Sequence, residues 1–530
     1  MNVQRNSKIW FFKLHQYSRK GFLKFRLNHH WIKPAGFETD IKIYNKIKNE
    51  KVPLILLNKN FVKWYLCGPT VYNSSHVGHA STYVRFDIIR RILEQNFGIR
   101  PVVALGITDI DDKIIKKANL LSTNFKTLAK KYELEFFKNL KDLNVLSPTF
   151  VLRVSDHIPH IIDFIYKIVD KRQAYVSKEG CVYFDTASFG KYGKLNPIPL
   201  ENSDPVRIGK KSYLDFTLWK AAKPGEPFWD SPWGNGRPGW HIECSAMASE
   251  IFGSKMDLHS GGIDLKFPHH ENEEAQSCSY HDCDQWVNYW LHSGQLMIDD
   301  EKMSKSLNNF ITIDEFLKTY SSDHMRMFCF ESHYRNALHY SSESMKTAVS
   351  TCNLFSDFLM DANSYIKSNW YKGNVEESII LKMSNVIKDC LMDDFNTSQC
   401  LISLMNLTKN TVRMMNEEVT VTSSRSPGAV AAVKTYVEGL LKSFGFQLDT
   451  ALSQEGEDDI KMEFILNSAI NFRQEVRKEA LALKDKTLKG NLLKSCDSFR
   501  ENLGTVGITL KDQEKNATSW GIKTKKELKH

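Results

Sequence analysis

The sequence has 530 residues, enough for two to four domains, and its hydrophobic content of 42% suffices for packed globular cores. It lacks an apolar run of about 18 residues, which argues against a membrane-spanning helix, and we expect no membrane partner. Its ten cysteines are scattered, which argues against a disulfide-rich secreted protein and favours reduced thiols or metal ligands. The net charge of +9 suits a polyanionic partner, although many soluble proteins carry such a charge.

Residues 1–37 form a basic segment in which no acidic residue precedes Glu38. Aromatic and leucine side chains are interleaved with the basic ones, as in WFFKLHQYSRKGFLKF. A cationic, acid-free and amphipathic N-terminus is typical of a mitochondrial transit peptide, so we expect a mitochondrial (matrix) protein. The alternative is a basic arm that contacts RNA, in which case the protein is cytoplasmic.

An α/β pattern begins near residue 61. The sequence predicts a buried strand at Phe61–Leu66, an amphipathic helix at Tyr83–Leu93 and a second strand at Pro101–Thr108. A strand, a helix and a strand within about 45 residues indicate a βαβ unit and a parallel sheet. We therefore expect a doubly wound, Rossmann-like α/β domain with an insertion, followed by a mostly α-helical C-terminal region.

Two segments have the chemistry of nucleotide binding. His76-Val77-Gly78-His79 lies between the first strand and the next helix, where a doubly wound sheet binds nucleotides. Its glycine lets a phosphate approach the backbone, and its imidazoles can donate to phosphate oxygens. Lys302-Met303-Ser304-Lys305-Ser306 supplies two lysines that can neutralise a triphosphate and its leaving group. Taken singly, each segment is equally consistent with an ordinary surface loop.

Four residues form a candidate metal set: Cys67, Cys244, His269 and Glu273. Pro268 is expected to open a helix, which would place His269 and Glu273 at i and i+4 on one face. Two thiolates, an imidazole and a carboxylate make a plausible zinc shell. The usual alternative for a buried cysteine is an inert core thiol. A rival set, without an obvious fourth ligand, consists of Cys278, His281 and Cys283.

Six stretches between about residue 61 and residue 340 resemble the cysteinyl-tRNA synthetase family in one uninterrupted order: WYLCGPTVYNSSHVGH, GITDIDDKIIKKA, GRPGWHIECSAM, GGIDLKFPHHENEEAQS, VNYWLHSGQLMI and EKMSKSLNNF. The pair HVGH and KMSKS is similar to the two signature motifs of class I aminoacyl-tRNA synthetases. The resemblance implies an enzyme that activates L-cysteine with ATP, forms cysteinyl-adenylate and transfers cysteine to the 3′ end of tRNA(Cys), releasing AMP and diphosphate.

The resemblance also implies roles for individual residues. One Zn²⁺ per chain would be held by Cys67, Cys244, His269 and Glu273. ATP, with Mg²⁺, would be bound by Thr70, His76, His79 and Lys305. Catalysis would involve His76, His79, Lys302 and Lys305. The cysteine pocket would be lined by Thr108, Trp240 and His259. Three departures from the family pattern remove none of these residues: Val77, Gly106 and Asn308.

A zinc ion would give the selection of cysteine a physical basis. Cysteine and serine differ by one atom, and apolar or steric discrimination between near-isosteres reaches only about 10–200-fold. Zinc lowers the pKa of a thiol and binds the thiolate directly, which a serine hydroxyl cannot match. Selection would then come from binding, and no editing domain would be needed.

The sequence predicts six regions. They are a transit peptide (1–37), the first half of the catalytic domain (38–149), an inserted segment (150–235), the second half (236–300), the KMSKS loop with a stem-contact region (301–365) and a helical anticodon-binding region with a basic tail (366–530). In the last region Trp520 either stacks on a base or caps the helical bundle. We expect the chain to act as a monomer.

Two other functions are compatible with part of the pattern. A ligase that joins cysteine to an amino sugar would share the zinc set and the adenylate chemistry, but it would have no use for the roughly 200 helical residues after KMSKS. An inactive synthetase-derived RNA-binding protein would not need the intact motif residues His76, His79, Lys302 and Lys305.

Overall fold

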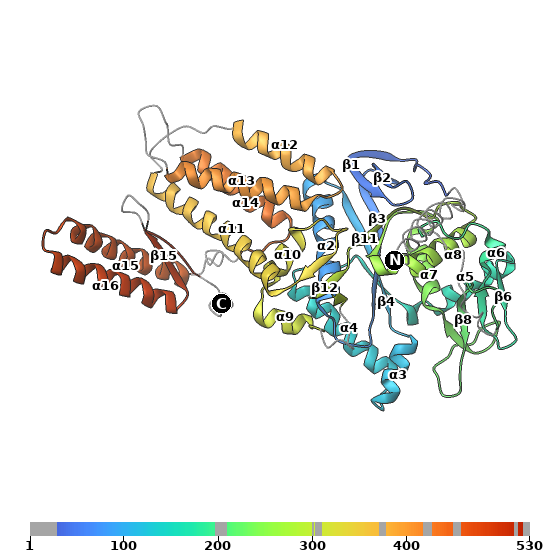
Figure 1. Ribbon diagram of the computed structural model, residues 1–530. Helices are drawn as coiled ribbons and strands as arrows, with labels where there is room; N and C mark the ends of the chain where they lie inside the picture. Colours follow the sequence, from blue (N-terminus) through green and yellow to red (C-terminus); the bar gives the residue numbers. More distant parts are fainter. Residues whose placement is uncertain are drawn as a thin grey trace, which may run out of the picture.

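The computed structural model describes residues 29–196, 209–298, 301–302, 310–369, 378–416, 427–448, 457–512 and 518–522. A sheet with helices on both faces occupies the middle of the molecule (Figure 1). A smaller sheet lies beyond it on one side, and long helices extend on the other. Residues 1–28, most of the expected transit peptide, lie outside the described part. Within the described residues, no helix is long and apolar enough to cross a membrane.

The central sheet has five parallel strands in the order β11-β10-β3-β4-β5. The strands are β3 (Phe61–Thr70), β4 (Arg100–Thr108), β5 (Phe150–Arg153), β10 (Met256–Gly262) and β11 (Val287–Ser293). From β3 the chain builds the sheet first toward β5, and it returns later to add β10 and β11 on the other side of β3. The doubly wound sheet predicted from the sequence is confirmed, and its switch point lies between β3 and β10.

Side chains alternate between the two faces of the sheet along β3. Trp64 and Leu66 belong to one hydrophobic core, and Tyr65 and Cys67 belong to another. The first core contains α2 (Val77–Arg91), α4 (Phe125–Asp142) and α10 (Ser322–Phe330). The second contains α5 (Ile158–Asp170), α7 (Trp240–Phe252) and α8 (Glu271–His281). The period of two in a strand therefore turns Cys67 toward α7 and α8.

Helix α2 begins earlier than the predicted start at Tyr83, because His76 acts as its N-cap. The His76 side chain accepts a hydrogen bond from Gly78 N, and the His79 side chain accepts one from His76 N. This is a capping box built from two histidines instead of the usual Ser or Thr with Glu or Gln. The helix then runs into a π-helical turn, η1 (Ile92–Asn96).

Two other sheets flank the N-terminal half of the chain. The hairpin of β1 (Phe37–Asn45) and β2 (Glu50–Leu56) is antiparallel. The region between β5 and α7 forms an antiparallel sheet in the order β6-β7-β8-β9. Its elements are β6 (Ala174–Val176), β7 (Val182–Phe184), α6 (Thr186–Phe189), β8 (Phe216–Ala221) and β9 (Gly236–Pro238). Shorter helices complete this half: α3 (Asp112–Leu120), η2 (Val154–Asp156), η3 (Ile263–Leu265) and η4 (Lys266–His270).

After β11 the chain forms a small sheet in the order β13-β12-β14 and then becomes mostly helical, as predicted. The small sheet and its two helices comprise β12 (Leu296–Ile298), β13 (Glu301–Lys302), α9 (Ile313–Thr319), α10 and β14 (Leu338–Tyr340). The helices that follow are α11 (Ser342–Asn369), α12 (Ser378–Met392), α13 (Thr397–Asn416) and α14 (Pro427–Ser443). The last described elements are α15 (Glu457–Ala482), α16 (Lys486–Thr505) and the hairpin of β15 (Ile508–Asp512) and β16 (Thr518–Ile522).

Candidate active site and metal centre

A cavity of about 390 Å³ opens beyond the carboxyl end of β3. Cys67 and Trp240 line one part of it, and His76, His79 and Phe310 line another. In doubly wound sheets this position, outside the strand ends at the switch point, is where ligands bind. The cavity therefore joins the candidate metal residues to the first nucleotide motif.

The capping box fixes how His76 and His79 can act. In each ring Nδ1 accepts a backbone N–H, at 3.1 Å from Gly78 N and 3.3 Å from His76 N respectively. A neutral imidazole that accepts at Nδ1 carries its proton on Nε2. The two rings lie close together, with centroids 3.8 Å apart. Burial lowers the pKa of His79 to about 4, so its ring is a neutral N–H donor at physiological pH, suited to a phosphate oxygen.

The four residues of the candidate metal set come together although they lie on four different elements. Cys67 is on β3, Cys244 on α7, His269 on η4 and Glu273 on α8. All four are buried, and one ligand atom from each lies within 4.8 Å of the others. Their role as zinc ligands stays a prediction, which the spacing of their atoms supports.

These spacings can be compared with a tetrahedral zinc shell. Zn–S bonds of about 2.3 Å and Zn–N or Zn–O bonds of about 2.0–2.2 Å imply ligand separations of about 3.8 Å for S–S, 3.6 Å for S–O and 3.4 Å for N–O. The structure has 3.9 Å between the Cys67 and Cys244 sulfurs, 3.7 Å from Cys67 Sγ to Glu273 Oε1 and 3.1 Å from His269 Nε2 to Glu273 Oε1. These three separations lie within about 0.3 Å of the values for one tetrahedral cation.

The electrostatics of the cluster also suit a cation. Burial raises the pKa of Cys67 well above its usual value, and its hydrogen bond with Cys244 and the charge of Glu273 act in the same direction. Burial raises the pKa of Glu273 and lowers that of His269. A divalent cation reverses the first two effects by binding the thiolates and the carboxylate. The shifts describe the cluster without a cation, and binding of a metal would be coupled to release of protons from the thiols and the carboxyl group.

Further histidines surround this set, and three of them were missed by the sequence reasoning. His259 Nε2 lies 2.8 Å from Glu273 Oε2, and His241 Nδ1 lies 2.9 Å from His269 Nδ1. His270 Nε2 lies 3.5 Å from Cys67 Sγ, and its Nδ1 lies 2.8 Å from His292 Nε2. Cys67, His259, His270 and Glu273 form a second group of ligand atoms within 4.8 Å. Such outer partners orient metal ligands. The adjacent pair His269-His270 is the one local signal that pointed to them.

The three residues expected in the cysteine pocket lie in different surroundings. Trp240 lines the cavity and stacks on His269, with ring centroids 4.4 Å apart. His259 is fully buried behind Glu273. The hydroxyl of Thr108 donates to Glu243 at 3.0 Å. Trp240 is therefore positioned to contact a ligand, whereas His259 and Thr108 are positioned to support the site from behind.

The second nucleotide motif falls mostly outside the described residues, including Lys305 and Asn308. The backbone of Lys302 belongs to β13, opposite Met297 of β12. After the motif, Ile311 accepts a hydrogen bond from Val77 N, and Phe310 packs against the His76 ring with centroids 5.1 Å apart. The chain on the far side of KMSKS thus returns to the start of α2. Thr70, another predicted ATP contact, lines the cavity.

The structure also bears on the rival metal set and on the departure from the family pattern at Gly106. His281 Nε2 lies 3.0 Å from Ser249 Oγ. Among the described residues, the ligand atoms of Cys278, His281 and Cys283 do not form one of the groups that could hold a metal ion. A Cβ on Gly106 would collide with the Tyr65 hydroxyl. Tyr65 therefore occupies the space that a larger residue at position 106 would need.

Comparisons with known proteins identify the class of the chain. A family model of the class I tRNA synthetase (C) catalytic domain matches residues 54–350. Methionyl-tRNA synthetase from Mycobacterium tuberculosis, solved with methionyl-adenylate, is similar in fold with a TM-score of 0.58 at 14% identity, over 73% of this chain and 91% of that one. The fold and the site define a class I aminoacyl-tRNA synthetase.

Two curated relatives show which family within this class the chain belongs to. A probable mitochondrial cysteine–tRNA ligase from Xenopus tropicalis is 41% identical over 94% of this chain and 92% of its own length. A cytoplasmic cysteine–tRNA ligase from Dictyostelium discoideum is also 41% identical, over 94% of this chain and 80% of its own length. This chain belongs to the cysteine–tRNA ligase family.

Proposed function

We propose that the chain activates L-cysteine with ATP and transfers it to the 3′ end of tRNA(Cys), with zinc selecting the thiol. The observation that carries the proposal is a single cavity that joins two features. Cys67 of the candidate metal set lines the cavity, and so do His76 and His79 of the histidine capping box. The names of the curated relatives support the same substrate.

In the first step the cysteine carboxylate attacks the α-phosphorus of ATP, and diphosphate leaves. His76 and His79 would donate Nε2–H to phosphate oxygens, and the predicted loop lysines Lys302 and Lys305 would neutralise the charge on the leaving diphosphate. Mg²⁺ bound with ATP would share that neutralisation. The protein supplies positioning and electrostatic stabilisation, and no protein nucleophile is required.

Selection of the amino acid would depend on the candidate metal set. Cys67, Cys244, His269 and Glu273 would hold one Zn²⁺, and a zinc ion binds a thiolate far better than a hydroxyl. His259 would keep Glu273 oriented, since its Nε2 lies 2.8 Å from the carboxylate. Trp240, stacked on His269, would form a wall of the cysteine pocket.

In the second step the terminal ribose hydroxyl of tRNA attacks the activated carbonyl, and AMP leaves. We infer that residues 301–365 contact the acceptor stem and that residues 366–530 bind the anticodon, with the chain acting as a monomer. The helices and the terminal hairpin from α11 onward support a separate RNA-binding region, because chemistry on a small acceptor would not need them.

Cysteine-dependent exchange between ATP and radioactive diphosphate tests the first step. We expect exchange with cysteine to exceed exchange with serine by at least about 1,000-fold, because binding through the metal adds to the roughly 10–200-fold that shape alone allows. Charging of tRNA(Cys), but not of other tRNAs, tests the second step. Equal exchange with serine would contradict the proposed zinc selection, and exchange without charging would contradict the proposed transfer.

We further infer that residues 1–37 direct the protein to mitochondria. The acid-free basic composition supports this, and one relative is named as mitochondrial, although the equally similar one is named as cytoplasmic. A reporter fused behind residues 1–37 should enter mitochondria, and the same reporter with Arg5, Lys8, Lys13, Arg19 and Lys20 changed to Glu should stay cytosolic. A cytosolic wild-type reporter, together with loss of tRNA affinity on truncation, would identify the segment as an RNA contact instead.

A further inference from the structure

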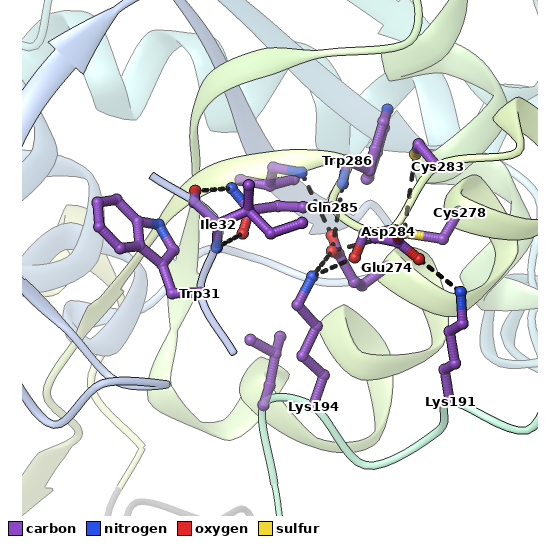
Figure 2. Close-up of polar contacts among 12 residues, drawn as sticks. Trp31, Ile32, Lys191, Lys194, Glu274, Cys278, Cys283, Asp284, Gln285 and Trp286 are labelled. Atoms are coloured by element: carbon purple, nitrogen blue, oxygen red, sulfur yellow. Dashed lines mark hydrogen bonds and ion pairs between the residues drawn. The ribbon is translucent and has the colours of Figure 1, made fainter. Parts of the chain in front are cut away.

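The C-terminal end of α8 brings two cysteines together. Asp282 adopts a left-handed conformation with φ of 54°, and the backbone N–H of Cys283 donates to the carbonyl of Cys278 at 3.2 Å. A six-to-one hydrogen bond around a left-handed residue is found in the Schellman motif, in which the side chains of these two positions normally make an apolar contact, and here the N–H of Asp282 donates to the same carbonyl. Here both positions are cysteines, and their sulfurs lie 3.9 Å apart (Figure 2).

Both thiols line a cavity of about 350 Å³ that is separate from the candidate active site. Cys278 is buried, and Cys283 is half-buried. The other walls include Phe189 and Lys191, from the end of α6 and the loop after it, and His30, from the segment before β1. A small reagent can therefore reach the pair without entering the cavity that holds His76 and Cys67.

Charged groups surround the pair unevenly. Lys194 Nζ donates to Glu274 Oε1 at 2.6 Å and to the carbonyl of Asp284 at 2.8 Å (Figure 2). Burial opposes the charge on this ammonium, but Glu274 raises the pKa of Lys194 overall, so it stays cationic. The sulfur of Cys278 lies 3.6 Å from Glu274 Oε1. Cys278 therefore faces a carboxylate, whereas an ammonium lies near both thiols.

The two thiols are consequently inequivalent. The hydrogen bond with Cys278 lowers the pKa of Cys283, and Lys194 and the backbone N–H of Gln285 act in the same direction against burial and the charge of Glu274. The pKa of Cys278 is raised by its hydrogen bond with Cys283, by burial and by Glu274. The more accessible sulfur is thus also the better nucleophile, an arrangement that suits an attacking and a resolving cysteine.

We propose that Cys278 and Cys283 form a redox modification site, at which a hydroperoxide oxidises the pair to an intrachain disulfide. The Cys283 thiolate attacks the terminal oxygen of the hydroperoxide, an S–O bond forms, the O–O bond breaks, and an alcohol or water leaves with the proton. Cys278 then attacks the sulfenic sulfur, an S–S bond forms, and water leaves. Two thiols lose two electrons and two protons, and the hydroperoxide is reduced.

The disulfide requires a movement of the two sulfurs. A disulfide needs sulfurs about 2.05 Å apart, so the two atoms must approach by about 2 Å from their present 3.9 Å. The six-to-one hydrogen bond already holds the two backbones side by side, and Cys283 lies in the loop after α8. The proposal is independent of the proposed function, because neither residue belongs to the candidate metal set.

Zinc-loaded full-length protein treated with hydrogen peroxide, then mapped by mass spectrometry without reduction, tests the site. We expect a peptide holding Cys278 and Cys283 that has lost two hydrogens and that dithiothreitol restores. In Cys278→Ser, dimedone should trap Cys283 as its sulfenic acid at least about tenfold faster than it labels Cys352, a half-buried thiol on α11. Cys352→Ser is the matched control and should form the disulfide at the wild-type rate.

Two outcomes would overturn the proposal. One is a Cys278–Cys283 pair that stays reduced at a peroxide dose that oxidises Cys352. The other is a second zinc ion per chain that disappears in Cys283→Ser, since the pair would then serve as a metal site. The first outcome is read from the peptide map of the wild-type protein. Poor folding of a variant therefore does not affect the decision on whether the pair is oxidised.

Discussion

The guanidinium of Arg326 on α10 donates to the carboxylate of Asp87 on α2 at 2.7 Å, and neither side chain is more than 1% exposed. Arg326 also donates to the carbonyls of Leu143, Asn144 and Phe444. Asp87 accepts further bonds from Arg91 and from the backbone of Leu146. The pair therefore joins the helix that starts with His76 to the loop after α4 and to the end of α14.

Replacing Arg326 with Met should destabilise the protein by about 3–5 kcal/mol, because the buried carboxylate of Asp87 would lose one of its two guanidinium partners and the carbonyls of Leu143 and Phe444 would lose the Arg326 donor. Urea denaturation followed by tryptophan fluorescence measures the change. The control is Lys138→Met, which removes an exposed ion pair with Asp142 and should change stability by less than about 1 kcal/mol. A similar loss in both variants would show that the buried pair has no special role.

Replacing Cys244 with Ser should remove most of the bound zinc and raise the KM for cysteine by about 100-fold, with the KM for ATP nearly unchanged. The sulfur belongs to the ligand cluster at one part of the cavity, whereas His76 and His79 line another. Metal analysis and diphosphate exchange measure these effects. Cys329→Ser, which changes a buried thiol on α10, should keep both zinc and KM. Full zinc retention in Cys244→Ser would contradict the assignment.

The pH dependence of stability should include a contribution from His79. Its pKa of about 4 in the folded protein lies below the usual value of 6.5, so between these values only the unfolded chain binds the proton. This contribution is fully present above pH 6.5 and is lost as pH falls toward 4. Relative to His79→Gln, the parent protein should lose about 1–2 kcal/mol more between pH 7 and pH 5.

Glutamine at position 79 can still accept from His76 N, which preserves the capping box while removing the titrating ring. Urea midpoints at pH 7 and pH 5 for both proteins give the comparison. Parallel losses in the two proteins would mean that His79 is not held neutral by burial.

Local patterns in the sequence were sufficient to predict the central sheet and the first nucleotide-binding motif, but they did not predict the histidines that surround the candidate metal set. The strand predicted at Phe61–Leu66 lies within β3, since a segment in which only Lys63 is charged and the other residues are aliphatic or aromatic has a clear signal. A lone histidine in a strand, such as His292 in β11, has no such signal, and its contact with His270 depends on the tertiary fold. The ligand assignment itself came from resemblance, because no spacing rule links Cys67 to Cys244.

The helix expected to open at Pro268 follows a break in the backbone. Phe267 is non-helical, with φ of −142° and ψ of 133°, and the helical turn after it continues through His270 into α8 at Glu271, which agrees with the expected start. His269 and Glu273 still lie four residues apart on adjoining turns and meet at 3.1 Å. For Trp520 the sequence left two interpretations open. Its indole N–H donates to Asn467 Oδ1 on α15 at 2.8 Å, which favours packing against the bundle.

Replacing Lys305 with Ala should lower kcat for diphosphate exchange by about 100-fold and change the KM for cysteine by less than about twofold. A loop lysine that meets charge mainly as diphosphate leaves acts in the transition state and not on bound cysteine. Steady-state exchange at varied cysteine concentration separates the two parameters. Lys318→Ala, which changes an exposed lysine on α9, is the control and should match the parent protein. An unchanged kcat with a raised KM for cysteine would assign Lys305 to amino-acid binding instead.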